Sequence, residues 1–238
     1  MANFPFQRLQ ADLAALIGKT PAGQRLPSEP DLAKQLGVSR ATLREAMRSF
    51  EAQGLIRRRQ GSGTFVVGKI QALDSGLEVL ESLETIARRM GLEVSLSDLS
   101  IETIPADEHL ASALNVNANA KLTRVRRVIR AENRPVAYLV DILPEDVLHS
   151  KDLPSDFNGS VLDFLLGRGT PLTTSRANVS AIGATAEVAK PMEIQRGDVL
   201  LHFYAQLFDV DGRIVDYSLS YFIPGYFHFH VVRRVGSG

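Results

Sequence analysis

The chain has no cysteine and no long apolar segment, and each absence excludes a class of protein. Without cysteine there is no disulfide, no thiolate nucleophile and no zinc site built from cysteine ligands. No apolar run approaches the roughly 18 residues that a membrane-spanning helix needs. The first 19 residues mix charges with apolar residues at helical spacing, which is unlike a secretory signal peptide. We therefore expect a cytoplasmic protein that does not contact membranes.

Charge is balanced overall but unevenly distributed along the chain. The 238 residues carry 27 Lys+Arg and 27 Asp+Glu. The first 70 residues hold 11 basic and 5 acidic side chains, whereas the remaining 168 hold 16 and 22. The length suits two domains of moderate size. A basic domain followed by an acidic one indicates that only the first meets a polyanion.

The first 67 residues predict three helices followed by a β-hairpin. Leucines at helical spacing predict a helix over 5–18. Ser28 and Ser39 each precede an amphipathic stretch and have the character of N-caps, so they predict a short second helix and a third over 40–53. The apolar period then changes to that of a strand, and the glycine-rich stretch 60–63 predicts the turn of a hairpin.

The outer face of the third helix has the side chains that DNA recognition needs. Arg40, Arg44 and Arg48 recur every four residues, away from the apolar stripe of the same helix. The planar fork of arginine can bond the O6 and N7 atoms of guanine, while hydroxyls and helix N-termini can bind phosphate. Solvated surface arginines are the alternative explanation for any one of them. The predicted DNA-binding residues are Ser28, Ser39, Arg40, Thr42, Arg44, Arg58, Arg59, Gly61, Ser62 and Gly63.

The motif LPSEPDLAKQLGVSRATLREA, followed by GLIRRRQGSGTFV, closely resembles the winged helix-turn-helix domain of the GntR family of bacterial regulators over about residues 6–67. The resemblance implies that Arg40 and Arg44 contact bases or adjacent phosphates and that Thr42 contacts the DNA backbone. It also implies that the turn at 61–63 is a wing tip in the minor groove. Pro30 stands where many members carry an arginine that touches DNA, so one such contact is expected to be missing.

The rest of the chain predicts mainly strands. Leu77, Leu80, Leu83 and Ile86 have helical spacing and predict a helix that reaches about Met90. Further helices are predicted near 107–114, 159–167 and 185–190, and strands over 124–130, 136–142, 199–208 and 214–222. The predicted organisation is a DNA-binding domain over 1–68, a linker over 69–76 and an effector-binding and dimerisation domain over 77–238.

Charged residues on these strands are candidates for ligand binding. Arg127, Asp141 and Asp216 fall on predicted strands, Arg176 follows a turn, and Ser160 begins a helix. Two arginines and a helix N-terminus suit a carboxylate or phosphate ligand. Because alternate residues of a strand often face water, simple solvation is the alternative for each of them.

Three stretches of this region are similar to the UTRA effector domain of the HutC-like branch of the GntR family. They are RVRRVIRAENRPVAYLVDILPEDV, SVLDFLLGRGTPL and GDVLLHFYAQLFDVDGRIVDYSLSYFIPGYFHF. The resemblance implies a curved antiparallel sheet with flanking helices, related to chorismate lyase, and hence an α+β chain. It also implies that Arg127, Ser160, Arg176 and Asp216 line a pocket, and that the loop 89–92 gives backbone N–H groups to a phosphate.

Several positions depart from relatives that sense phosphorylated sugars. Ile129 replaces an arginine, Leu139 replaces an acidic residue, and Phe222 stands where a tyrosine is common. Together with Tyr138, these residues favour a ligand that is less polar than an amino-sugar phosphate. The predicted effector-binding residues are Arg89, Met90, Gly91, Leu92, Arg127, Tyr138, Asp141, Ser160, Arg176, Asp216 and Phe222.

The sequence therefore predicts a repressor that a small anionic metabolite releases from a near-palindromic DNA operator. One recognition helix per chain requires a homodimer to read two half-sites. The five histidines have neither metal-site nor triad spacing, so we expect no catalytic residue, metal or cofactor. An enzyme of chorismate-lyase-like fold tethered to DNA, and a DNA-binding protein without an effector, are the alternatives.

Overall fold

The computed structural model describes residues 5–21, 23–52, 55–59, 62–67, 73–154, 157 and 159–232. The chain divides into two compact units. The first comprises the N-terminal residues through Ala72 together with the segment Ile223–His228, and the second comprises the remainder from Leu73. Helices dominate the first unit and antiparallel strands the second, so the chain is of the α+β class.

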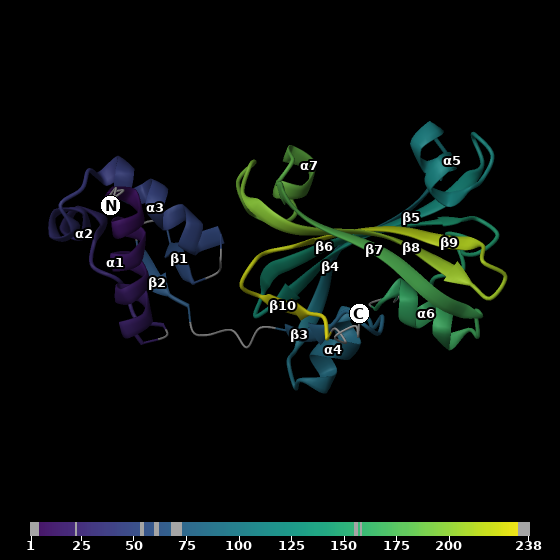
Figure 1. Ribbon diagram of the computed structural model, residues 1–238, viewed down its shortest axis with the longest axis horizontal. Coiled ribbons are helices and arrows are strands. Elements are labelled where there is room, and N and C mark those ends of the chain that lie inside the picture. Colours follow the sequence, from purple (N-terminus) through teal and green to yellow (C-terminus); the bar gives the residue numbers. More distant parts are fainter. Residues whose placement is uncertain are drawn as a thin grey trace, which may run out of the picture. The chain divides into compact units, whose positions relative to one another are not determined.

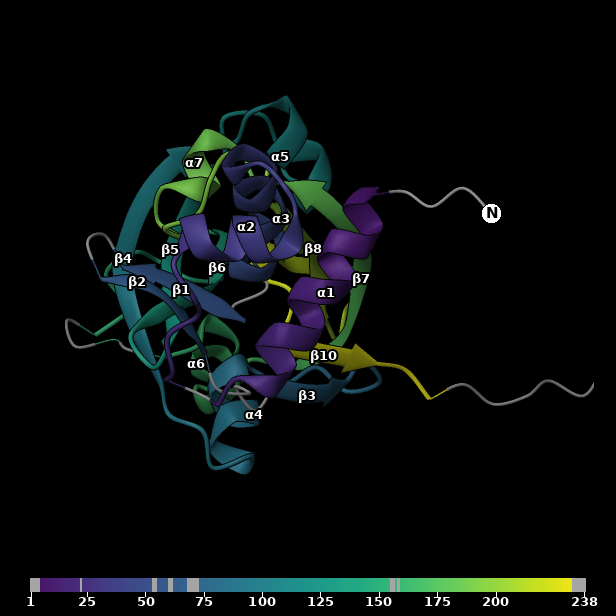
Figure 2. The ribbon, with the colours of Figure 1, turned by 90° about the vertical axis from the view of Figure 1, so that its left-hand side faces the viewer.

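The first unit has three helices and a two-stranded hairpin (Figures 1 and 2). Its elements are α1 (Pro5–Lys19), α2 (Glu29–Leu36), α3 (Arg40–Ala52), β1 (Ile56–Arg59) and β2 (Gly63–Val66). The backbone at Arg25 forms an isolated antiparallel bridge with Phe65 of β2. The N–H of Leu26 donates to the carbonyl of Thr64 at 2.8 Å, which ties the segment before α2 to β2.

One apolar cluster holds these elements together. Leu13, Leu32, Leu43 and Met47 come from the three helices and are fully buried. Ile56 adds the hairpin to the same cluster. Burying a side chain of this size contributes roughly 1.5–3 kcal/mol, so this cluster fixes the outer faces of α2 and α3 relative to the hairpin.

The second unit is built on a six-stranded antiparallel sheet in the order β4-β5-β6-β9-β8-β7. Its strands are β4 (Val94–Pro105), β5 (Lys121–Ala131), β6 (Arg134–Pro144), β7 (Leu172–Gly183), β8 (Val199–Asp209) and β9 (Ile214–Phe222). Its helices are α4 (Leu83–Arg89), α5 (Glu108–Leu114), α6 (Val161–Gly167) and α7 (Ala186–Ala189). A separate two-stranded sheet pairs β3 (Leu73–Gly76) with β10 (Phe227–His230).

The strand register divides the side chains of the sheet between two faces. Arg127 pairs with Leu139, which pairs with Ser220, so these residues share one face, which we call the pocket face. Val128 pairs with Tyr138, which pairs with Tyr221, so these share the opposite face, which we call the tyrosine face. Figure 1 shows α4 and α6 on one side of the sheet and α5 and α7 on the other.

Side-chain contacts assign the helices to these faces. Val161 and Leu165 of α6 cluster with Val125 and Leu143, so α6 covers the pocket face. On the tyrosine face, the ring of His109 in α5 meets that of Tyr217 edge-on at 5.7 Å.

Two expectations about the start of this unit need correction. The helix predicted from Leu77 to Met90 begins only at Leu83, because the Ser82 side chain accepts a hydrogen bond from the N–H of Thr85 at 3.0 Å and caps it there. The last four residues of the predicted linker, 73–76, form strand β3. The rest of that linker lies outside the described residues.

Candidate nucleic-acid interface and effector pocket

The N-termini of α2 and α3 are capped by the serines that the sequence indicated. The N–H of Asp31 donates to the Ser28 hydroxyl at 3.4 Å, and the N–H of Thr42 donates to that of Ser39 at 3.0 Å. The hydroxyls of Ser39 and Thr42 also lie 2.8 Å apart. These caps use donors that helix ends otherwise leave unpaired, and they fix where the outer face of α3 begins.

The outer face of α3 presents arginines to solvent. Arg40, Thr42 and Arg44 are exposed, while Leu43 and Met47 of the same helix are buried. Arg48 is paired with Glu45 at 3.0 Å on the exposed surface. The helix therefore has the buried and exposed faces that a recognition helix in a DNA groove requires.

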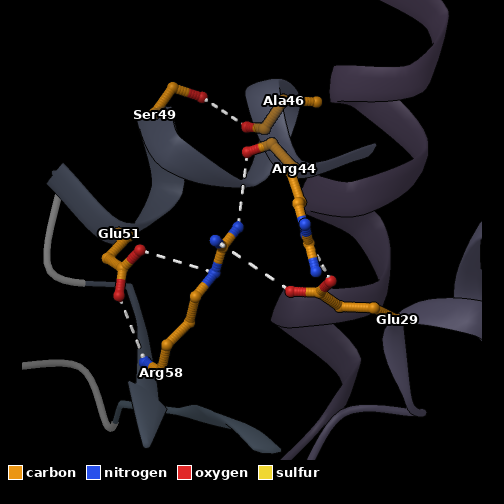
Figure 3. Close-up of polar contacts among 6 residues, drawn as sticks. All are labelled: Glu29, Arg44, Ala46, Ser49, Glu51 and Arg58. Atoms are coloured by element: carbon orange, nitrogen blue, oxygen red, sulfur yellow. Dashed lines mark hydrogen bonds and ion pairs between the residues drawn. The ribbon is translucent and has the colours of Figure 1, made fainter. Parts of the chain in front are cut away.

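Glu29, at the start of α2, joins that face to the hairpin (Figure 3). Its Oε2 accepts a hydrogen bond from Nε of Arg44 at 2.7 Å, and its Oε1 lies 4.0 Å from NH1 of Arg58 in β1. Arg58 also donates to the carbonyl of Arg44 at 3.3 Å and lies 3.5 Å from Oε2 of Glu51. Two carboxylates and two guanidinium groups thus connect α2, α3 and β1 in one network, which we call the Glu29 network.

Arg44 and Arg58, which were both predicted to bind DNA, differ in how far their side chains are exposed. The Arg44 side chain is 53% exposed, whereas that of Arg58 is 28% exposed and lies within the network. Arg58 is one of the predicted DNA-binding residues, and its contacts also tie the hairpin to α3.

The hairpin turn brings a further arginine beside the wing. Ser62 is exposed in the turn, and Gly63 has a φ of +110°. The positive φ favours glycine at this position. A Cβ there would also meet the Arg25 guanidinium, which lies directly over Gly63. Gly61 and the side chain of Arg59 lie outside the described residues. Sequence reasoning missed Arg25 and Glu29, because neither lies on the recognition helix or in the turn.

In the second unit, a buried charge cluster lies on the pocket face of the sheet. Arg127 is 4% exposed and forms an ion pair with Asp141 on the neighbouring strand. Asp216 is also buried and accepts a hydrogen bond from the N–H of Ile142 at 3.2 Å. Glu84 of α4 acts electrostatically on Arg127 as well. The positive charge of Arg127 therefore interacts with the carboxyl groups of Asp141, Asp216 and Glu84.

The pKa values in this cluster shift in the directions that burial and like charge dictate. Burial raises the pKa of Asp216 well above its usual value, and the charge of Asp141 raises it further. Burial also raises the pKa of Glu84, against the opposing pull of Arg127. Both Glu84 oxygens and the Nε of Arg127 are buried without a hydrogen-bond partner among the described residues.

An open pocket of about 980 Å³ lies at the end of α4 and α6, and Glu84 is part of its wall. Ser160 and Leu92, both predicted from the sequence, line it too. The other residues of its wall are Arg88, Glu93, Val94, Ser95, Arg130, Glu132, Asn133, Pro154, Phe157, Gly159, Asp163 and Phe164. The basic side chains of the pocket are thus Arg88 and Arg130, whereas Arg127 lies behind Glu84 and is not part of the wall.

The structure does not bring all the predicted effector residues together. Arg176 is exposed on β7, pairs through β8 with Tyr217, and therefore lies on the tyrosine face with Tyr138. Three strands separate it from Arg127, a distance of roughly 19 Å at the usual strand spacing. Tyr138 stacks on Tyr221, with ring centroids 6.0 Å apart.

The remaining predicted residues occupy the pocket-face core and the end of α4. Phe222 is buried on the pocket face, against Phe203 and Phe229. Ser160 caps α6, where its hydroxyl accepts from the N–H of Asp163 at 3.2 Å. Arg89, exposed at the end of α4, is paired with Glu81 at 2.6 Å.

The loop 89–92 does not have the form expected for a phosphate cradle. The N–H groups of Met90, Gly91 and Leu92 donate to the carbonyls of Ile86, Arg88 and Ala87, and so close the C-terminus of α4. A helix C-terminus carries partial negative charge, which disfavours a phosphate there. The expected N–H contacts are therefore already used within the chain.

The described ranges lack metal sites and membrane-spanning helices. These ranges contain no group of three histidine, aspartate or glutamate side chains placed to hold a metal ion. None of the helices in the same ranges has both the length and the apolar character that a membrane crossing requires.

Three helices, two of them capped by serines, an arginine-bearing outer face and a glycine-turned hairpin define a winged helix-turn-helix DNA-binding protein. Residues 6–66 match the model of the bacterial regulatory proteins of the gntR family, and residues 89–228 match the model of the UTRA domain. The chain therefore belongs to the UTRA-carrying regulators of the gntR family and is a transcriptional regulator. GntR regulators bind DNA, and UTRA domains bind small-molecule effectors.

Individual relatives agree with this assignment. The chain is 29% identical over 184 residues to the histidine utilization repressor of Pseudomonas putida, covering 77% of this chain and 73% of that one. It is 24% identical over 217 residues to the mannosyl-D-glycerate transport/metabolism system repressor MngR of Escherichia coli, covering 91% and 90%. The crystal structure of PhnF from Mycobacterium smegmatis has the same fold, with a TM-score of 0.65 at 22% identity over 96% of this chain and all of that one.

Proposed function

We propose that this regulator is a repressor that binds a near-palindromic operator as a homodimer and leaves it when a small anionic metabolite occupies the UTRA domain. The exposed arginines of α3, held beside the wing by the Glu29 network, carry the DNA-binding part of this proposal. The pocket beside α4 and α6 carries the effector part. We infer no catalytic activity and a cytoplasmic location.

The homodimer follows from the single recognition helix in each chain. Two helices held by one dimer can reach successive major grooves and read two half-sites. Dimerisation through the sheet-rich second unit would leave both winged units available to DNA. Analytical ultracentrifugation at micromolar concentration tests this, and a monomer both with and without bound DNA would refute it.

The charges of the pocket refine the chemistry of the effector. Arg88 and Arg130 are the basic groups in its wall. Arg130 already donates to Ser97, Asn133 and Glu193, so we propose Arg88 as the main partner of a carboxylate or phosphate. The same wall carries the acidic side chains of Glu93 and Glu132, which suit an N–H or O–H group on the ligand. We therefore propose a metabolite that carries an anionic group at one end and hydrogen-bond donors at the other.

Calorimetry tests the effector part of the proposal. A thermal-shift screen of phosphorylated and carboxylated metabolites identifies the compound, which is then titrated into the protein with and without bound DNA. Ligand and operator must weaken each other by the same factor if the coupling is allosteric. Equal ligand affinity in the two titrations would leave a DNA-binding protein without effector control.

Two arginine variants make that test specific for the pocket. Arg88→Ala should weaken ligand binding by at least tenfold, roughly the value of one charged hydrogen bond. Arg176→Ala removes the same charge from the tyrosine face and should leave ligand binding unchanged. The reverse result would move the effector site to the tyrosine face.

A further inference from the structure

We propose that Glu29 is a specificity-determining residue: it positions Arg44 for base reading and thereby separates operator binding from general DNA binding. This inference rests on the proposed DNA-binding role of α3. Glu29 is negatively charged, as DNA is, so a search for phosphate-binding residues would not select it.

The geometry gives Glu29 two arginine neighbours, which also contact each other. One carboxylate oxygen of Glu29 accepts a hydrogen bond from Nε of Arg44 at 2.7 Å, and the other lies 4.0 Å from NH1 of Arg58. Arg58 in turn donates to the carbonyl of Arg44 itself. The side chain and the backbone of Arg44 are thus held from two elements, α2 and β1, as Figure 3 shows.

Holding the Nε side of a guanidinium has a direct consequence for base reading. An arginine that binds guanine must place two N–H groups in the plane of the base, and a free side chain loses rotamer freedom when it does so. Glu29 restricts Arg44 before DNA arrives and leaves its other N–H groups for the base. The loss of freedom is then largely complete in the unbound protein.

The same carboxylate works against general DNA binding. A negative charge at the edge of the basic surface repels phosphates and lowers the affinity for every sequence. Glu29 therefore has opposite effects on the two kinds of binding: it strengthens the operator complex through Arg44 and weakens the complex with random DNA through its charge. A residue that only stabilised the fold would change both in the same direction.

The opposite arrangement is also physically possible and gives the opposite result. If Glu29 held Arg44 away from DNA, the ion pair would have to break on binding, and removing the carboxylate would strengthen operator binding. The two arrangements therefore predict opposite changes in operator affinity when the Glu29 carboxylate is removed.

The experiment uses the full-length protein and two DNA duplexes. The first is the tightest-binding duplex recovered from a randomised pool with the wild-type protein, and the second is a scrambled duplex of the same composition. For Glu29→Gln we expect the affinity ratio between the two to fall by about tenfold, with binding to the scrambled duplex unchanged or stronger. An unchanged ratio, or a tighter complex with the selected duplex, would overturn the proposal.

Glu45→Gln is the matched control. It removes an equal charge from α3, but its partner is the exposed Arg48. It should strengthen binding to both duplexes by the same factor and leave their ratio unchanged. A fall in the ratio equal to that of Glu29→Gln would attribute the effect to charge alone and overturn the proposal.

A double-mutant cycle with Arg44→Ala identifies the route of the effect. If Glu29 acts through Arg44, Glu29→Gln should not lower the ratio further in the Arg44→Ala protein. An equal fall in both backgrounds would refute the positioning role. Failure of the proposed function gives a different result, because the wild-type protein would then bind the selected and scrambled duplexes equally.

Discussion

The two units of the chain use charged side chains in opposite ways. In the winged unit, the Glu29 network lies near the surface, with Arg44 half-exposed and its carboxylate partner close to solvent. In the UTRA unit, Arg127 and Asp216 lie inside the molecule, on one face of a sheet. The first arrangement costs little to build and orients groups that meet DNA. The second costs desolvation energy, which the ion pair between Arg127 and Asp141 offsets.

Removal of one arginine from each face of the sheet should give the largest contrast. Arg127→Ala leaves the buried carboxylates without their cation and should lower the free energy of unfolding by about 3–5 kcal/mol. Arg176→Ala, on an exposed part of the same sheet, should change it by less than about 0.5 kcal/mol. Urea unfolding of the two variants measures both. Similar losses would mean that the cluster around Arg127 is no more costly to break than a surface contact.

Loss of Arg44 should affect binding without affecting folding. Arg44→Ala should cost about 1–3 kcal/mol of binding to a selected operator duplex, because one base-reading contact is lost. The melting temperature should stay close to that of the wild type, since the side chain is half-exposed. Fluorescence anisotropy measures the binding free energies for the selected and the random duplexes. Equal losses on both duplexes would contradict a base-reading role.

The caps of α3 allow a finer test within the winged unit. Ser39→Ala removes the acceptor for the N–H of Thr42 and should lower stability by about 1 kcal/mol. Ser49→Ala lies in the same helix, where the hydroxyl donates only to the carbonyl of Ala46, and should be neutral or slightly stabilising. Thermal unfolding compares the pair. Equal destabilisation by both would remove the special role of the N-cap.

The smallest effect is a pH dependence that arises in the UTRA unit. Because the pKa of Glu84 is raised above its ordinary value of 4.5, the folded protein holds a proton that the unfolded chain releases. Stability due to this group therefore falls as the pH rises above 4.5. Glu84→Gln removes this dependence, so the variant should gain on the wild type with rising pH and match it below 4.5. Denaturant unfolding between pH 4 and 8 measures the gap, and a gap that narrows with rising pH would contradict the sign.

The same contrast explains which features the sequence could predict. N-caps at Ser28 and Ser39 depend on residues three positions apart, and the structure confirms both. The faces of Arg127 and Arg176 depend on the pairing of distant strands, and a shift of one residue in register reverses a face. Sequence reasoning therefore placed them in one site, whereas the register separates them.

The functional residues that were missed share the same cause. Glu29 is fifteen positions from Arg44, and Glu84 is more than forty from Arg127, so neither pairing follows from local spacing. The loop 89–92 differs from its expected form for another reason. Its glycine reads equally well as a ligand-binding turn or as a helix C-cap, and only the hydrogen bonds of the folded chain distinguish the two.

The alternation of side chains along the strands of the UTRA sheet also bears on how such regulators change over evolutionary time. Each strand carries pocket-face and tyrosine-face residues in turn, so neighbouring codons specify surfaces that do not touch each other. Substitutions on the pocket face, at Leu139 or Phe222 for example, can leave the stacked pair of Tyr138 and Tyr221 on the other face intact. New ligand preferences can therefore be acquired on one surface while a second surface is inherited unchanged.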